Sequence, residues 1–300
     1  MRSGTIAIAR DGVLIGGAPV TFERRAGLEW LHASPWLLPG TPLARPGHHA
    51  EVDIAVGTAL AAEARVRGVA GGEWVVYRPE GPAPDPMALE SVGGETRLMH
   101  AGVVELGSGI EGAWKRLERH ARQDLAAARR RGLVTAEEPG ALEAAHALYV
   151  AQARGWGAHR PLPIELARRL LAPGEDGARE ARLFTARDGR GLLSAVLVLA
   201  GEHEWFAWWS GSHPDARRRH AFPLLLWSAA EAAAAAGARR FNVGASAGRA
   251  GVESFKRTLG ATLVPVHVRW IDARHAPLAG RVVAALQARW RRGRSRGEGA

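Results

Sequence analysis

The chain has 300 residues, of which 47% are hydrophobic and none is cysteine, and its formal net charge is +10 at pH 7. This hydrophobic content suffices for one large or two ordinary cores, so a disordered protein is excluded. The lack of cysteine excludes disulfides, thiolate metal sites and a thiol intermediate. No apolar run reaches the ~20 residues of a membrane span, and the N-terminus lacks a secretory-signal pattern. A cytoplasmic protein with an anionic partner is expected.

The first third of the chain predicts three strands, a helix and a fourth strand. Two strands meet at Asp11-Gly12, a strong hairpin signal, and a third is expected at 27–33. A helix is predicted from about 50 to 67, where a glycine stops it, and a strand follows at 73–77.

A helical connector is predicted next, with helices at 114–131, 140–154 and 163–171. None of these segments has the long heptad pattern of a helical-hairpin arm. The connector therefore separates the first group of strands from a second group.

The order strand, strand, strand, helix, strand recurs in this second group. A strand pair turns at Asp188-Gly189, and a third strand is expected at 204–210. A helix over 222–236 ends before a glycine and leads into a strand at 239–243. The repeated order predicts an internal duplication.

The C-terminal part predicts a strand at 262–270 and a helix at 277–292. One face of that helix carries an apolar stripe: Leu278, Val282, Val283 and Leu286. From Arg274 to Arg296 the sequence has seven arginines and no Asp or Glu. We expect the stripe to pack on the second domain. The alternative is that the tail from Arg289 docks at the anionic inner membrane surface.

Lysine usage singles out one residue. Lys115 and Lys256 are the only lysines among 40 basic residues. Lysine offers a compact ammonium that places a point charge better than the planar guanidinium does. Lys256 is therefore a functional candidate, with survival by chance under a coding bias as the alternative.

Three segments carry a family resemblance. Residues 251–260 read GVESFKRTLG and follow Phe241-Asn-Val-Gly244, which resembles the signature Y-D-x-G … G-h-x-x-F-K-x-x-F-G of the FemABX family, the aminoacyl-tRNA-dependent transferases that build peptidoglycan bridges. Segments 122–133 and 222–237 are similar to two more family patterns, in the right order. The resemblance is clearest from about 116 to 265.

The resemblance implies an α/β (α+β) fold of two tandem GNAT-like, that is acetyltransferase-like, domains. Their expected bounds are 1–110 and 176–300, joined by the connector at 111–175. It also implies an aminoacyltransferase of cell-wall biogenesis, with aminoacyl-tRNA as donor and a UDP- or lipid-linked muramyl peptide as acceptor. No cofactor and no metal are expected, and the enzyme should be a monomer.

The same resemblance assigns roles to residues. Lys256, with Phe255 beside it, would stabilise the oxyanion of the tetrahedral intermediate. Glu253 is the one candidate for a general base, unless the acceptor or water takes the proton. Ala126-Ala127 replaces a basic pair of the family pattern, which puts one basic contact in doubt. The expected substrate-binding residues are Arg122, Arg219, Trp209, Gly244, Ser246 and Arg257. The alternatives are a core position for Trp209 and a solvated surface charge for Arg257.

The loop before the helix of the second repeat distinguishes between two possible acyl donors. Acetyltransferases that bind coenzyme A carry glycines there, so that backbone N–H groups hold the pyrophosphate. This chain has His220 and Phe222 at those positions, which favours aminoacyl-tRNA. Two alternatives stay open: an acyl-coenzyme A-dependent N-acyltransferase of polysaccharide or natural-product synthesis, and a non-catalytic RNA- or envelope-binding protein.

Overall fold

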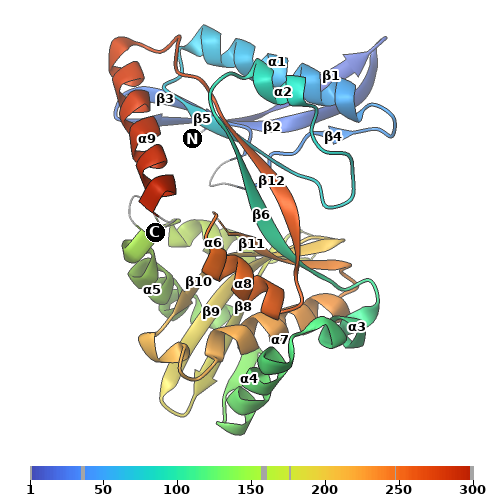
Figure 1. Cartoon of the computed structure of the whole chain (residues 1–300). Coiled ribbons are helices and arrows are strands. Elements are labelled where there is room, and N and C mark those ends of the chain that lie inside the picture. Colours follow the sequence, from blue (N-terminus) through green and yellow to red (C-terminus); the bar gives the residue numbers. More distant parts are fainter. Residues whose placement is uncertain (1, 35–37, 157–160, 176, 247, 298–300) are drawn as a thin grey trace. The chain divides into compact units, whose positions relative to one another are not determined.

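The computed structural model describes residues 2–34, 38–156, 161–175, 177–246 and 248–297, with side chains except at 156 and 290–297. The chain forms two compact units (Figure 1). Unit 1 comprises Met1–His100 with Val264–Ala300, and unit 2 comprises Ala101–Leu263. Strands β6 (Thr96–Glu105) and β12 (Thr262–Trp270) each cross from one unit to the other. None of the described helices has the length and apolar character needed to cross a membrane.

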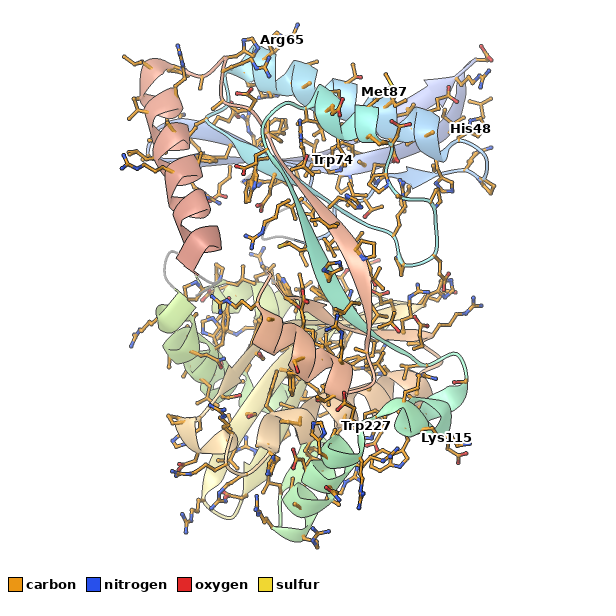
Figure 2. The ribbon with its side chains drawn as sticks, viewed as in Figure 1. His48, Arg65, Trp74, Met87, Lys115 and Trp227 are labelled. Atoms are coloured by element: carbon orange, nitrogen blue, oxygen red, sulfur yellow. The ribbon has the colours of Figure 1, made fainter. Side chains whose placement is uncertain are left out.

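Unit 1 is a sheet with helices α1 and α2 on one face. Its further elements are β1 (Arg2–Arg10), β2 (Val13–Arg25), β3 (Leu28–His32), β4 (Leu43–Ala44), α1 (His49–Arg67), β5 (Gly72–Tyr77), α2 (Pro86–Ser91) and α9 (Leu278–Gly297). Strands β1, β2 and β3 pair antiparallel, and β3 pairs parallel with β5. Leu31, Val56 and Leu60 are fully buried in the core between this sheet and α1, together with Trp74 (Figure 2).

Local sequence explains the boundaries within unit 1. Asp11 and Gly12 both have positive φ, at 52° and 76°, as a two-residue turn of type I′ requires. Helix α1 ends at Gly68, which adopts the left-handed conformation and donates its N–H to the last turn. The hairpin and the helix stop predicted from the sequence are therefore confirmed.

Unit 2 is a sheet covered on both faces. Its elements besides β6 are α3 (Gly109–Arg116), α4 (Arg119–Arg130), β7 (Val134–Glu137), α5 (Leu142–Ala153), α6 (Ile164–Leu171), β8 (Ala181–Asp188), β9 (Gly191–Ala200), β10 (Glu204–Ser212), α7 (Ala221–Ala235), β11 (Arg240–Ala245) and α8 (Ala250–Thr258), with single 3-10 turns at Pro139–Ala141, Arg154–Trp156 and Pro214–Ala216. Helices α4 and α7 pack on one face, where Trp227 (Figure 2) meets Trp114 edge-on at a centroid distance of 5.4 Å. Helix α5 packs on the other face, where Tyr149 stacks on Trp209.

The duplication expected from the sequence is present. The order β1, β2, β3, α1, β5 in unit 1 recurs as β8, β9, β10, α7, β11 in unit 2. The strand pairings also agree, with two antiparallel contacts followed by one parallel contact in each unit.

The strand that follows each repeat pairs with a strand of the other unit. Strand β6 follows the first repeat but pairs with β11 in unit 2. Strand β12 follows the second repeat but pairs with β5 in unit 1, from Val266↔Tyr77 to Trp270↔Glu73. The observed units therefore differ from the expected division: residues 264–300 group with the first repeat, and the connector at 111–175 lies within unit 2.

Three further differences concern helices and strands. The segment 114–131, predicted as one helix, contains the end of α3 and all of α4. The helix is interrupted because Leu117 adopts an extended backbone conformation (φ −60°, ψ 140°). The sequence pattern did not predict strands β6 and β7. The expectation that the stripe of α9 packs on the second domain is wrong, since α9 belongs to unit 1 and Leu278, Val282 and Leu286 are exposed.

Candidate functional site

Two neighbouring strands of unit 2 separate in the middle of the sheet. The parallel pairing of β10 with β11 runs from Glu204↔Arg240 to Phe206↔Asn242. Beyond that point β10 continues against β9 as far as Ser212, and β11 continues against β6. The end of β11 therefore has no described pairing with β10.

Lys256 reaches this open strand end from helix α8. Its side chain is 4% exposed, and its Nζ donates to the carbonyl oxygen of Gly244 at 2.5 Å. The aliphatic stem passes over Gly102 of β6, where an added Cβ would lie only 2.7 Å from Lys256 Cδ. A glycine in β6 thus makes room for the lysine that α8 supplies.

The surroundings of Lys256 tune its charge. Burial lowers its pKa from 10.5 to about 8, and the carboxylate of Glu253 opposes that shift. The group is thus mostly protonated at pH 7. An ammonium has three N–H donors, and among the described residues only the Gly244 carbonyl accepts one of them. The other two donors are available to an oxygen atom of a substrate.

Asn242 fixes the backbone that receives Lys256. Its Oδ1 accepts the N–H of Gly244 at 2.8 Å, and its Nδ2 donates to Glu204 at 2.9 Å. Arg240 donates to the other oxygen of that carboxylate at 2.8 Å. Gly244 itself has φ +79°, which favours glycine. Glu204, Arg240 and Asn242 are all buried or half-buried, so this network is fixed before any ligand arrives.

Sequence reasoning missed these three residues as site residues. Asn242 lay inside the recognised motif, and an Asx residue two positions before a glycine is a known signal for a side chain that bonds the local backbone. Glu204 and Arg240 carried no such signal, because their pairing depends on the parallel register of β10 and β11.

Ser246 lies two residues beyond Gly244 and is 2% exposed. Its Oγ has no hydrogen-bond partner among the described residues. A buried hydroxyl without a partner costs free energy of about 1–3 kcal/mol. A polar group of a ligand at this end of β11 would supply the missing partner.

Phe255 supports α8 on the core of unit 2. Its ring stacks on Phe222 of α7 at a centroid distance of 6.1 Å and an interplanar angle of 20°. It is half-buried, so one part of the ring stays available to a ligand, whereas Arg257 on the same helix is exposed.

The other predicted binding residues have partners within unit 2. The Nη1 of Arg122 approaches the carbonyls of Trp114 and Lys115, at 3.4 and 3.5 Å, at the end of α3. Arg219 forms an ion pair with Asp188. Trp209 is 5% exposed and stacks on Tyr149 at 4.9 Å, which makes it a core residue. The structure thus brings Lys256 to Gly244, two residues before Ser246, and engages the side chains of Arg122, Arg219 and Trp209 in other contacts.

The start of α7 departs from a glycine-rich anion loop. His220 is the residue before the helix and has φ +56°, in the left-handed region that favours glycine. Its Nδ1 lies 3.3 Å from the carboxylate of Asp124. A side chain with an acidic neighbour therefore stands where a small residue would be needed for a phosphate to approach the backbone.

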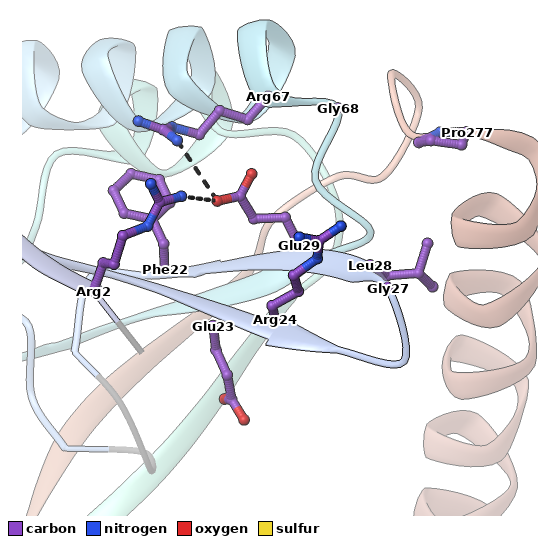
Figure 3. Close-up of a pocket in the computed structure, with 10 residues that line it drawn as sticks. All are labelled: Arg2, Phe22, Glu23, Arg24, Gly27, Leu28, Glu29, Arg67, Gly68 and Pro277. Atoms are coloured by element: carbon purple, nitrogen blue, oxygen red, sulfur yellow. Dashed lines mark hydrogen bonds and ion pairs between the residues drawn. The ribbon is translucent and has the colours of Figure 1, made fainter.

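An opening of about 490 Å³ in unit 1 has a different character (Figure 3). Arg2 and Arg67 project from its wall, and both pair with Glu29, at 2.9 and 3.6 Å. Arg67 also lies over the ring of Phe22. Glu29 thus pairs with two arginines, and none of the predicted site residues belongs to unit 1. Among the described residues no cluster of His, Asp and Glu could hold a metal ion.

Comparison with known proteins identifies the fold. Residues 115–257 match the family model described as an acetyltransferase (GNAT) domain. The crystal structure of FemX is similar, with a TM-score of 0.62 and 13% identity over 89% of this chain and 87% of that one. No curated protein matches the sequence.

Two further structures are similar over nearly the whole chain. The C-terminal domain of a putative lysylphosphatidylglycerol synthetase from Agrobacterium fabrum has a TM-score of 0.55 and 15% identity, over 90% of this chain and 84% of that one. L-PGS from Bacillus licheniformis has a TM-score of 0.54 and 14% identity, over 91% and 86%. The expected arrangement of two tandem GNAT-like domains is confirmed, and the matches support an acyltransferase.

Proposed function

From the FemABX-like GNAT fold that this chain has, we propose that it transfers an amino acid from aminoacyl-tRNA to an amine of a UDP- or lipid-linked muramyl peptide. The observation that carries the proposal is the buried ammonium of Lys256 at the open end of β11. An ammonium is costly to bury.

The reaction is an acyl transfer from an ester to an amine. The neutral amine nitrogen attacks the carbonyl carbon of the aminoacyl ester, so a C–N bond forms and the carbonyl oxygen becomes an oxyanion. The C–O bond to the tRNA ribose then breaks, the ribose oxygen leaves as a hydroxyl, and the proton it gains balances the one that the amine loses. The products are an amide and free tRNA.

The residues of unit 2 fit this sequence of steps. The two unengaged N–H donors of Lys256 stabilise the oxyanion, and removal of one such donor typically costs 10²–10³-fold in turnover. The Oγ of Ser246 donates to the donor carbonyl or to the acceptor. The network of Asn242 and Glu204 holds the Gly244 carbonyl, so that Lys256 is already oriented when substrate binds.

The choice of donor rests on the start of α7. His220 and its neighbour Asp124 occupy the place where an acyl-coenzyme A enzyme presents bare backbone N–H groups to a pyrophosphate. This supports a donor other than acyl-coenzyme A. The match to an acetyltransferase domain model favours the second candidate function, an N-acyltransferase that uses acyl-coenzyme A.

Replacement of Lys256 tests the proposal. In an assay with charged tRNA and a muramyl pentapeptide acceptor, Lys256→Ala and the stem-preserving Lys256→Met should lower turnover about 100-fold or more. Lys256→Arg should restore part of it. Lys115→Ala is the matched control, because Lys115 is the other lysine and is exposed on α3 (Figure 2). Turnover of both Lys256 variants within a few-fold of wild type, with the fold intact, would remove this residue from the mechanism.

A further inference from the structure

Helix α9 carries an exposed apolar stripe. Leu278, Val282 and Leu286 follow one another at intervals of four residues and so share one face of the helix. Their exposed fractions are 75%, 50% and 62%. A single exposed apolar residue is ordinary, but three on one helix face form a contiguous patch of the kind that marks an interaction surface.

The opposite face of α9 carries small residues toward unit 1. Gly280 is buried, and a Cβ added there would lie 3.0 Å from Cβ of Ala276 and 3.2 Å from Cβ of Ala70. Ala284 and Ala288 line an opening of about 360 Å³ beside Trp270. A helix of a globular protein normally turns its largest apolar residues inward. Here the small residues face the unit and the large ones face solvent.

The charge on this helix has one sign. Arg281 and Arg289 are exposed on α9. Between Arg274 and Arg296 the sequence has seven arginines and no acidic residue. The face formed by Leu278, Val282, Leu286 and Arg289, with Arg281 at its edge where it also lines the opening beside Asp272, is called here the α9 face. It is both apolar and cationic.

We propose that the α9 face docks on the surface of an anionic phospholipid bilayer. The helix would lie in the plane of the interface, with Leu278, Val282 and Leu286 inserted at the boundary of the acyl chains and the arginines among the headgroups. This inference does not depend on the proposed reaction, because it concerns a face of unit 1 alone.

Other partners match only half of the α9 face. A nucleic acid would satisfy the arginines but leave the three apolar side chains in water. A second copy of this chain would cover the stripe, yet it would bring two cationic helices together. An anionic bilayer offers both an apolar layer and negative headgroups, so it fits the stripe and the charge together.

Co-sedimentation of the full chain with vesicles tests the docking. Vesicles of phosphatidylcholine, with or without phosphatidylglycerol, are the probe. The wild type should bind only the vesicles that contain phosphatidylglycerol, and salt should weaken this binding. Replacement of all three stripe residues, Leu278→Ser, Val282→Ser and Leu286→Ser, should weaken it at least about tenfold. Arg281→Gln and Arg289→Gln should each weaken it about fivefold, the equivalent of one basic residue at the headgroups.

A matched control lies on another helix of unit 1. Val66 is 83% exposed on α1 and follows the exposed Arg65. Val66→Ser with Arg65→Gln also removes an exposed apolar side chain and an exposed basic one, and it should leave vesicle binding unchanged. Absence of binding to anionic vesicles, or equal loss in the control, would overturn the proposal. A lowered Tm in the stripe variant would also overturn it, because the stripe would then pack within the chain. The same holds if the variants of the α9 face keep their vesicle binding but lose binding to RNA.

Discussion

At the scale of single residues, two effects act in opposite directions on Lys256. Burial favours the neutral amine, whereas the Glu253 carboxylate favours the ammonium. The resulting pKa of about 8 places the loss of its charge within the range of ordinary assays. An exposed lysine would keep its charge to a pH about two units higher.

The rate of transfer should therefore depend on pH through Lys256. In the proposed mechanism the ammonium is protonated below about pH 8 and stabilises the oxyanion, and as pH rises through its pKa of about 8 that stabilisation should be lost. The acceptor amine acts in the opposite sense, since it must be neutral. A pH profile of kcat should rise and then fall above about pH 8. In Lys256→Arg, whose guanidinium stays charged, the falling limb should be absent; a falling limb unchanged by that substitution would assign it to another group.

Lys256 could be chosen as a candidate from the sequence, whereas the network around it could not be predicted. A rare lysine inside a recognisable motif is a local signal. The role of Asn242 depends on its bond to Glu204, and that bond exists only because β10 and β11 pair in one register. Arg122 and Arg219 carried the right charge for substrate binding, but a charge in the sequence does not reveal that carbonyls or an aspartate engage it.

At the scale of elements, the sequence predicts what is local. Hairpins, helix stops and the repeated order of strands follow from turn residues and periodicity, and they are present in the structure. Strand β6 was missed because its sequence, with polar and apolar residues mixed at both ends, has no clear alternation. The same strand supplies the glycine on which the Lys256 stem rests, so the site depends on an element that the pattern did not indicate.

Gly102→Ala should impair transfer without a change of any polar group. A Cβ at this position would lie 2.7 Å from Cδ and 3.0 Å from Cβ of Lys256, and 3.0 Å from Val243. The lysine must then shift, and displacement of a catalytic group by about 1 Å can cost ~100-fold in rate. We expect kcat to fall at least about tenfold, measured under single-turnover conditions.

Gly107→Ala provides the control for this change. No atom lies within 4 Å of a Cβ built at Gly107, and its φ is not in the left-handed region. This variant should keep wild-type kcat. Equal rates for Gly102→Ala and Gly107→Ala would show that the contact between Gly102 and Lys256 does not position the reacting group.

At the scale of the whole molecule, the exchange of β6 and β12 is the feature that sequence reasoning could not supply. Each strand follows one repeat and pairs in the other unit, so the pairing joins segments that are far apart in the chain. Sequence patterns indicate the order of elements along the chain, whereas the partner of a strand depends on tertiary contacts. The expected boundary at 176 reflects this, because it assigned each strand to the repeat that precedes it.

The net charge of +10 also belongs to the whole molecule. A tRNA donor presents a long row of phosphates, and contacts with them release counterions, so its binding should weaken steeply as salt rises. A coenzyme A thioester carries far fewer charges and should depend on salt much less. The identity of the donor therefore has a signature beyond the chemistry at Lys256.

The central claim, transfer from aminoacyl-tRNA, is tested most directly by product formation with each donor in parallel. The wild type, a muramyl pentapeptide acceptor and a panel of charged tRNAs should give an aminoacylated product by mass spectrometry. Ribonuclease should abolish that product and moderate salt should reduce it. Product formed at an unchanged rate from a coenzyme A thioester in ribonuclease-treated reactions, with none from charged tRNA, would contradict the claim.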